Sequence, residues 1–151
     1  MSDKPLRLVL FDFDGTLCDS AATIIRLMKR ACAACDLPVP EDSFIRGNIG
    51  HGVSHAALAY ADGDPEKASQ LAETYRHIAC NEYLGGQPPL DPLFDGAKDI
   101  LRTLQSKDYL TGIITNKSRT GLDSLITRLG LGQQVGLPFS ADDCMGKPAP
   151  A

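Results

Sequence analysis

The sequence predicts an α/β fold with a parallel sheet whose strands are separated by a long helical segment. Two short apolar runs, at residues 6–13 and 110–114, lack the alternation of a half-exposed strand, as expected when both faces of a strand are covered. Segments with helical periodicity follow each run. The resulting order of strand, helices, strand, helix and strand is typical of parallel α/β sheets.

The first strand, at residues 6–13, precedes a helix that Asp19 or Ser20 can cap, because short polar side chains accept hydrogen bonds from the free N–H groups at a helix start. Apolar residues recur in this helix at helical spacing and predict one buried face. That face contains Ile24, Ile25, Met28, Ala31, Cys32 and Cys35. Pro38 and Pro40 end the helix, because proline cannot continue one.

The segment at residues 42–84 predicts several further helices, which are separated by turns rich in glycine. Pro65 suits the first position of the last of these helices, because proline has no N–H group to leave unpaired there. Residues 85–89 contain two glycines and two prolines. They predict a linker, and with it a domain boundary.

The last third of the chain predicts a helix over residues 96–107, a buried strand over 110–114 and a weak third strand near 135–139. The inward residues of the helix are Ile100, Leu101 and Leu104. Ser118 can cap a further helix after the second strand, and Gly130 can end it.

The composition is that of a globular protein and excludes several function classes. The chain has 151 residues, of which 43% are hydrophobic, and a net charge of −4. This charge argues against a general nucleic-acid binder, which needs clustered Lys and Arg. The first apolar run is too short for a secretory signal or a membrane span. Five cysteines, an odd number, argue against a disulfide scaffold, so we expect a reduced, cytoplasmic enzyme that does not bind membranes.

The most informative segment is Asp-Phe-Asp-Gly-Thr-Leu at residues 12–17, directly after the first predicted strand. Open α/β sheets bind ligands at the carboxyl ends of their strands, so a ligand is expected here. Asp12 and Asp14 project to the same side of an extended chain. Two like charges held close need a compensating cation, and Mg²⁺ prefers oxygen ligands and commonly joins carboxylates to phosphate.

These residues can divide the work of phosphoryl transfer. Asp12 can attack phosphorus and form an aspartyl phosphate. Asp14 can protonate the leaving alcohol and then deprotonate the water that hydrolyses the intermediate. Backbone N–H groups of Gly15 and Thr16 can turn toward the phosphoryl oxygens. The alternative is a strand that simply ends in an acidic turn, which the full hexapeptide after a buried strand disfavours.

The hexapeptide resembles the first motif of the haloacid dehalogenase superfamily, and Cys-Asp-Ser at residues 18–20 continues it as in phosphoglycolate phosphatases. Residues 113–117, Ile-Ile-Thr-Asn-Lys, resemble the second motif, and Gly-Lys-Pro at 146–148 resembles the third. The resemblance implies that the Thr115 hydroxyl holds a phosphoryl oxygen, that Asn116 contacts the substrate and that Lys147 neutralises the charge shared by Asp12 and the phosphoryl group.

The resemblance also implies an architecture. Residues 1–17 and 88–151 would form a Rossmann-like core with a parallel sheet, which is incomplete, and residues 18–87 would form an inserted helical cap. In such a cap, Arg46 and His51 beside the glycine turn could meet a substrate carboxylate. The Cys-x-x-C spacing at residues 32–35 lies on a predicted apolar helix face, so buried thiols are expected rather than a redox or zinc site.

The expected activity is that of a Mg²⁺-dependent phosphomonoester hydrolase acting on a small phosphorylated metabolite, with 2-phosphoglycolate as the best guess by resemblance. The family's fourth motif, which supplies another Mg²⁺ carboxylate, does not follow residues 146–148. We therefore expect a fragment or a prematurely ended form of such an enzyme, with weakened Mg²⁺ binding and with the Asp12 strand at an exposed sheet edge. Two alternatives stay open: a phosphomutase resembling β-phosphoglucomutase, which the Thr-Asn-Lys sequence disfavours, and an inactive binding module.

Overall fold

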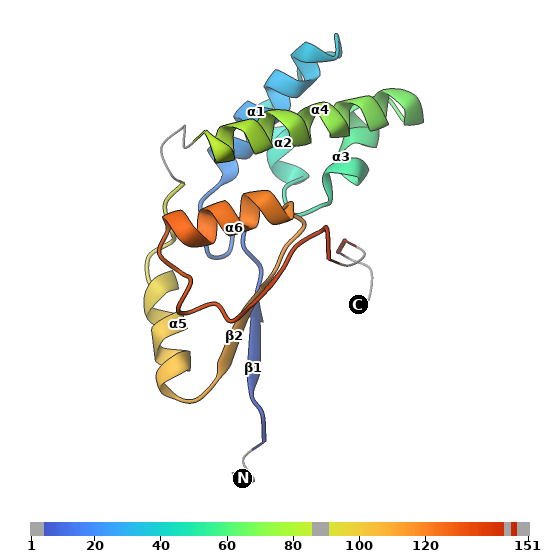
Figure 1. The fold of residues 1–151 in the computed structure, drawn as a ribbon. Helices are drawn as coiled ribbons and strands as arrows, with labels where there is room; N and C mark the ends of the chain where they lie inside the picture. The colour runs from blue at the N-terminus through green and yellow to red at the C-terminus, as the bar shows by residue number, and fades with distance from the viewer. Residues whose placement is uncertain (1–4, 86–90, 144–145, 148–151) are drawn as a thin grey trace.

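The computed structural model describes residues 5–85, 91–143 and 146–147. In this part of the chain a short sheet is combined with two groups of helices (Figure 1). The elements in chain order are β1 (Leu8–Phe11), α1 (Ala21–Ala34), α2 (Asp42–Gly47), α3 (Val53–Tyr60), α4 (Pro65–Leu84), α5 (Ala97–Ser106), β2 (Leu110–Ile114), α6 (Arg119–Arg128) and β3 (Leu137–Phe139).

The three strands form one parallel sheet in the order β1-β2-β3. Leu8 pairs with Leu110, and Gly112 pairs with Leu137. The predicted α/β fold with a parallel sheet is therefore confirmed. Helices α1 to α4 gather beyond the carboxyl ends of the strands, whereas α5 and α6 belong to the sheet half of the molecule (Figure 1). The end of the sheet where α/β proteins bind ligands thus faces the α1–α4 layer.

The first strand is less covered than the sequence predicted. Leu8 and Leu10 are each 44% exposed, and Val9 and Phe11 are half-buried. The prediction that both faces of this strand are covered is therefore wrong. β1 lies at the edge of the sheet, and among the described residues it pairs with β2 alone. This position agrees with the expected exposed edge.

Two predictions about single side chains, one at the start of a helix and one on a helix face, are also wrong. Ser20 is the first residue before α1, but its hydroxyl makes no cap and instead donates to Oδ1 of Asp14 at 2.6 Å. Ile100 of α5 was expected to point inward and is 44% exposed, whereas Leu101 is fully buried. The α5 helix packs through a narrower apolar stripe than its sequence suggests, because only Ala97 and Leu101 are buried.

Other predicted helix boundaries are confirmed. The Asp64 side chain accepts hydrogen bonds from the amides of Glu66 and Lys67, with Pro65 opening α4. The Ser118 hydroxyl accepts from the amide of Gly121 at the start of α6. These caps satisfy N–H groups that a helix cannot pair internally. The predicted linker at residues 85–89 falls almost entirely outside the described residues.

Buried apolar side chains form two clusters rather than one. The sheet core unites the sheet with α5, α6 and one side of α1, and it contains Phe13, Leu17, Leu27, Leu101, Ile113, Leu122, Leu125 and Leu131. The helical core lies within α1 to α4 and contains Ile25, Met28, Ala31, Cys32, Ile45, Ala57 and Leu71. Fully burying a side chain of this size contributes about 1.5–3 kcal/mol. Tyr75 and Ile78 of α4 pack against both cores.

Two backbone segments connect the sheet half of the molecule to the α1–α4 layer. Segments 17–19 and 92–94 run side by side: the Asp19 amide donates to the Pro92 carbonyl at 2.9 Å, and the Phe94 amide donates to the Leu17 carbonyl at 3.0 Å. The chain therefore leaves and re-enters the sheet half at one place.

None of the helices in the described part of the chain has the length and apolar character needed to cross a membrane.

Candidate active site

A pocket of about 470 Å³ lies where the strand ends meet the α1–α4 layer. Asp12 and Asp14, which follow β1, and Thr115, which follows β2, line it together with Lys147. Parallel strands end at the same edge of a sheet, which explains why residues far apart in sequence meet here. The structure therefore brings together all four residues that were predicted to carry the chemistry.

Asp12 and Lys147 form an ion pair across this pocket. The Lys147 Nζ donates to Oδ1 of Asp12 at 2.6 Å, although the two residues are 135 positions apart in sequence. Both side chains are partly exposed, so each remains accessible from the pocket. Lys147 thus supplies a positive charge at the carboxylate that would act as nucleophile.

Asp14 is held more deeply than Asp12. Its Oδ1 accepts from the Ser20 hydroxyl at 2.6 Å and lies 3.2 Å from Nζ of Lys117. The Asp14 and Lys117 side chains are only 13% and 7% exposed. Burial alone would lower the pKa of Lys117, but the charge of Asp14 opposes it and the pKa of Lys117 is raised above its ordinary value. Lys117 is therefore a buried cation that holds Asp14.

Lys117 also ties the sheet half to α4. Its Nζ donates to the Tyr83 hydroxyl at 3.1 Å and lies 5.1 Å from the centroid of the Tyr83 ring, within the range of a cation–π contact. Its backbone amide donates to Oγ1 of Thr115 at 3.2 Å. No role was predicted for Lys117 itself from the sequence. Its place in the Thr-Asn-Lys segment was the only available signal.

Asn116 was predicted to contact substrate, and its side chain lines the pocket but binds the protein's own backbone. Its Oδ1 accepts from the Lys147 amide at 2.8 Å. Its Nδ2 donates to the carbonyl oxygens of Lys147 at 3.2 Å and Gly50 at 2.8 Å. Both N–H donors of the amide are therefore in use. Asn116 fixes the Lys147 backbone and joins it to the glycine turn between α2 and α3.

Three other predicted residues are not brought into the pocket: Gly15, Thr16 and Arg46 are absent from its lining among the described residues. The Gly15 amide donates to the Cys18 carbonyl at 2.9 Å, and the Thr16 amide donates to the Phe13 carbonyl at 3.3 Å. The turn after β1 thus uses these N–H groups itself, which corrects the expectation that they face a phosphoryl group. Arg46 is exposed on α2.

The α1–α4 layer contributes polar groups to the opposite wall of the pocket. His51 lines this wall, as predicted, and its ring lies 5.3 Å from that of His55, measured between centroids. Arg76 of α4 lines it too, and its Nη2 donates to Oγ of Ser54 in α3 at 2.6 Å. Neither His55 nor Arg76 was predicted as a site residue from the sequence.

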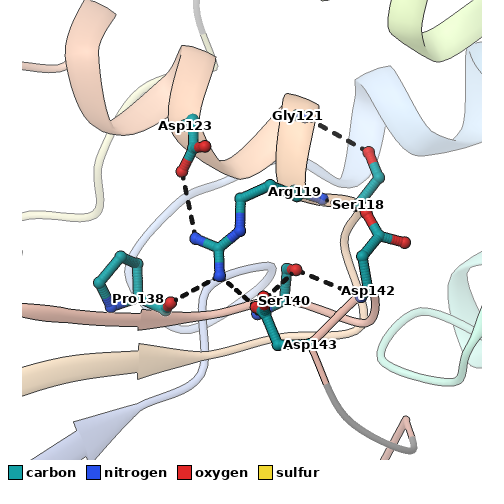
Figure 2. A network of polar contacts seen from close by, with 8 residues as sticks. All are labelled: Ser118, Arg119, Gly121, Asp123, Pro138, Ser140, Asp142 and Asp143. Atoms are coloured by element: carbon teal, nitrogen blue, oxygen red, sulfur yellow. Dashed lines mark hydrogen bonds and ion pairs between the residues drawn. The ribbon is translucent and has the colours of Figure 1, made fainter.

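A network centred on Arg119 fixes the loop after β3 (Figure 2). The Arg119 guanidinium donates to the Pro138 carbonyl at 2.9 Å and pairs with Asp143, while the Arg119 amide donates to Oδ2 of Asp142 at 2.6 Å. Hydrogen bonds to the Ser140 backbone amide and hydroxyl hold the pKa of Asp143 below its usual value. Asp142 and Asp143 thus join the loops that follow β2 and β3 (Figure 2).

The oxygen ligands that a divalent metal ion prefers come here from the two carboxylates of the pocket. Among the residues that the structure describes, no group of three or more His, Cys, Asp or Glu side chains gathers in a way that could hold one. Asp12 and Asp14 line the same pocket, however, and Mg²⁺ is commonly held by one or two carboxylates together with phosphate oxygens and water. The two carboxylates therefore fit a divalent metal ion whose other ligands would be phosphate oxygens and water.

Comparisons with known proteins place the sequence in a known family. Residues 9–151 match the family model described as haloacid dehalogenase-like hydrolase. The chain is 33% identical over 138 residues to N-acetylmuramic acid 6-phosphate phosphatase from Pseudomonas putida, covering 91% of this chain and 60% of that protein. It is 32% identical over 152 residues to phosphoglycolate phosphatase from Yersinia pseudotuberculosis, covering 98% and 65%.

Solved structures share the fold. A hydrolase from Pseudomonas syringae superposes with a TM-score of 0.73 at 21% identity, covering 94% of this chain and 63% of that one. A protein described as a predicted phosphatase from Clostridium acetobutylicum gives a TM-score of 0.79 at 21% identity, with 95% and 65% covered. The chain spans 60–65% of the length of the two curated relatives described above. Because the family model matches nearly the whole sequence, the chain belongs to the haloacid dehalogenase-like hydrolase family.

Proposed function

We propose that this chain carries the reaction centre of a Mg²⁺-dependent phosphomonoester hydrolase that works through an aspartyl phosphate on a small phosphorylated metabolite. The observation that carries the proposal is the convergence of Asp12, Asp14, Thr115 and Lys147 on one pocket. The curated relatives support a phosphatase, since the two reported above are named for phosphoglycolate and for N-acetylmuramic acid 6-phosphate. Phosphoglycolate remains our best single guess for the substrate.

The chemistry follows from the positions of the two carboxylates. A carboxylate oxygen of Asp12 forms a bond to phosphorus while the bond from phosphorus to the alcohol oxygen breaks, and Asp14 gives its proton to that oxygen. Asp14 then removes a proton from water, whose oxygen attacks phosphorus and releases phosphate and the Asp12 carboxylate. The contacts of Asp14 with Ser20 and Lys117 both use Oδ1, so Oδ2 is left for these proton transfers.

Thr115 and Lys147 would serve the phosphoryl group itself. The buried Thr115 hydroxyl would donate to a phosphoryl oxygen, and the Lys147 ammonium would neutralise charge on Asp12 and on that group. Asp12 would hold the metal with its carboxylate, and Asp14 with a group other than the Oδ2 that transfers protons. When bound, Mg²⁺ would offset the negative charge of the carboxylates and the phosphate.

We further propose that residues 18–87 act as a cap over a core made of residues 1–17 and 88–151. The separate helical core and the single pair of connecting segments at 17–19 and 92–94 support this division. The pocket between the two halves supports it as well, because both halves contribute to its lining. A cap of this kind excludes water from the reaction and selects the part of the substrate beyond the phosphate.

The test is phosphate release from phosphoglycolate and from p-nitrophenyl phosphate, with and without Mg²⁺. Asp12→Asn should reduce kcat at least 1,000-fold, on the order of the losses seen when a catalytic nucleophile is removed, because a carboxamide is not a competent nucleophile. Asp19→Asn is the matched control, since Asp19 is exposed beside the same motif and outside the pocket lining. Hydrolysis by Asp12→Asn at the wild-type rate would reject Asp12 as the nucleophile.

A further inference from the structure

The wall of the pocket that faces the strand ends carries a cation without a partner of opposite charge. Three Lys or Arg residues line the pocket among the described residues: Lys117, Lys147 and Arg76. Lys117 is paired with Asp14, and Lys147 is paired with Asp12. Arg76 forms no ion pair with any residue that the structure describes, and its polar contact is to the neutral hydroxyl of Ser54.

The surroundings of Arg76 are built from two helices. Tyr75, Arg76, Ala79 and Tyr83 share the face of α4 that lines the pocket, as their spacing along a helix requires. Ser54 and His55 come from the first turn of α3. The contact from Arg76 to Ser54 fixes the guanidinium between the two helices and leaves its other N–H groups available. The Ser54 hydroxyl keeps its own proton to donate.

We propose that Arg76, supported by Ser54 and the imidazoles of His51 and His55, binds a carboxylate at the end of the substrate remote from its phosphate. The proposal rests on the proposed function, and it defines the substrate class as phosphomonoesters of carboxylic acids. A guanidinium forms paired hydrogen bonds with a carboxylate, which suits this role better than a point charge would. The pocket has room for a group larger than phosphate, at about 470 Å³.

The apolar part of the lining fits the same ligand. The α1–α4 layer also contributes apolar and aromatic side chains to the pocket lining, which are Ile24, Met28, Ile45, Ile49, Val53, Tyr60 and Tyr75. Such a lining suits a carbon skeleton that separates two charged ends. A ligand with a single charged end would leave Arg76 facing an uncharged group.

The test compares phosphomonoesters that carry a carboxylate with related ones that lack it. One short pair is phosphoglycolate and 2-hydroxyethyl phosphate. One long pair is N-acetylmuramic acid 6-phosphate and N-acetylglucosamine 6-phosphate, which lacks the lactyl carboxylate. The variants are Arg76→Gln, which removes the charge, and Arg76→Lys, which retains it. Arg46→Gln is the matched control, because Arg46 is an exposed arginine of the same layer outside the pocket lining.

Arg76→Gln should lower kcat/KM about 10-fold for the carboxylate member of at least one pair, mainly through KM, as expected for a lost charged hydrogen bond at an exposed site. The neutral member should change by less than about 3-fold, a difference under 1 kcal/mol. Arg76→Lys should recover part of the loss, and Arg46→Gln should change neither member. Equal losses for both members, or no loss for either carboxylate, would overturn the proposal.

Binding measurements can test this inference even if the proposed function fails. If the chain hydrolyses none of the four phosphates, the proposed function fails, and calorimetric titration with phosphoglycolate and 2-hydroxyethyl phosphate still tests Arg76. Weaker binding of phosphoglycolate alone to Arg76→Gln would support the carboxylate site. Equal affinities of wild type and Arg76→Gln for phosphoglycolate would overturn it.

Discussion

Replacing Lys117 by methionine should destabilise the protein strongly, because it removes the cation beside a buried carboxylate. The Lys117 Nζ lies 3.2 Å from Oδ1 of Asp14. At an effective dielectric constant of 20, two unit charges at that separation attract by about 5 kcal/mol. Breaking a buried pair from one side typically costs about 3–5 kcal/mol. Asp14 also lines the pocket and can turn toward water, so we expect a loss near the lower end, about 3 kcal/mol.

The assay is urea unfolding at pH 7, followed by far-ultraviolet circular dichroism, with the slope m checked for each variant. Lys67→Met is the matched control. The Lys67 Nζ lies 3.8 Å from Oδ2 of Asp64, and the two side chains are 61% and 41% exposed. An exposed pair of this kind contributes less than about 1 kcal/mol. The control should therefore leave the free energy of unfolding nearly unchanged.

The double variant Lys117→Met with Asp14→Asn tests the cause of the loss. Removing both charges leaves no unpaired buried ion, so the double variant should be more stable than the sum of the two single losses predicts, by about 2 kcal/mol. The reasoning is refuted if Lys117→Met costs less than about 1 kcal/mol. It is refuted equally if the two substitutions prove additive.

Two further predictions concern the sheet and the buried thiols. Gly112→Ala should destabilise the protein by about 1–3 kcal/mol, because the new Cβ would lie 2.6 Å from the Leu137 carbonyl oxygen of the neighbouring strand. Gly132→Ala is the control, because a Cβ there would have no atom within 4 Å. Equal urea midpoints for the two variants would contradict this prediction. Burial raises the pKa of Cys18 to about 12 and that of Cys32 to about 11, from 9.0. Because the thiols ionise at lower pH in the unfolded chain, their contribution to the free energy of unfolding is complete below pH 9 and falls as the pH rises toward these values. Cys32→Ala should make this fall between pH 9 and 11 shallower by up to about 1.4 kcal/mol per pH unit. Parallel curves of unfolding free energy against pH for the wild type and Cys32→Ala would contradict this prediction.

The sequence predicted the elements of the fold well where the signal is local. The start of α4 at Pro65, the Ser118 cap and the apolar runs of β1 and β2 depend on neighbouring residues, and the structure has them where they were expected. The covering of β1 depends on what packs against it, which a strand's own sequence does not contain. Leu8 and Leu10 are consequently more exposed than predicted.

In the candidate site, too, features set by local sequence were predictable and features set by tertiary packing were not. Residues at strand ends could be placed from the order of the elements, and the pairing of Lys147 with Asp12 could be anticipated only through the family resemblance. Arg46 was chosen because it adjoins the glycine turn in sequence, yet it lies outside the pocket lining. Arg76 lies on a long amphipathic helix. Which face of that helix meets the pocket is decided by packing between distant segments.

A protein with two separate hydrophobic cores can melt in two steps, each core opening while the other persists. Here α4 belongs to both, since Tyr75 and Ile78 contact the side chains of each. Opening either core would remove the neighbours that these two residues have there and would loosen the other core. A heating scan should accordingly give a single endotherm for the chain, with the pocket and the helical layer lost together.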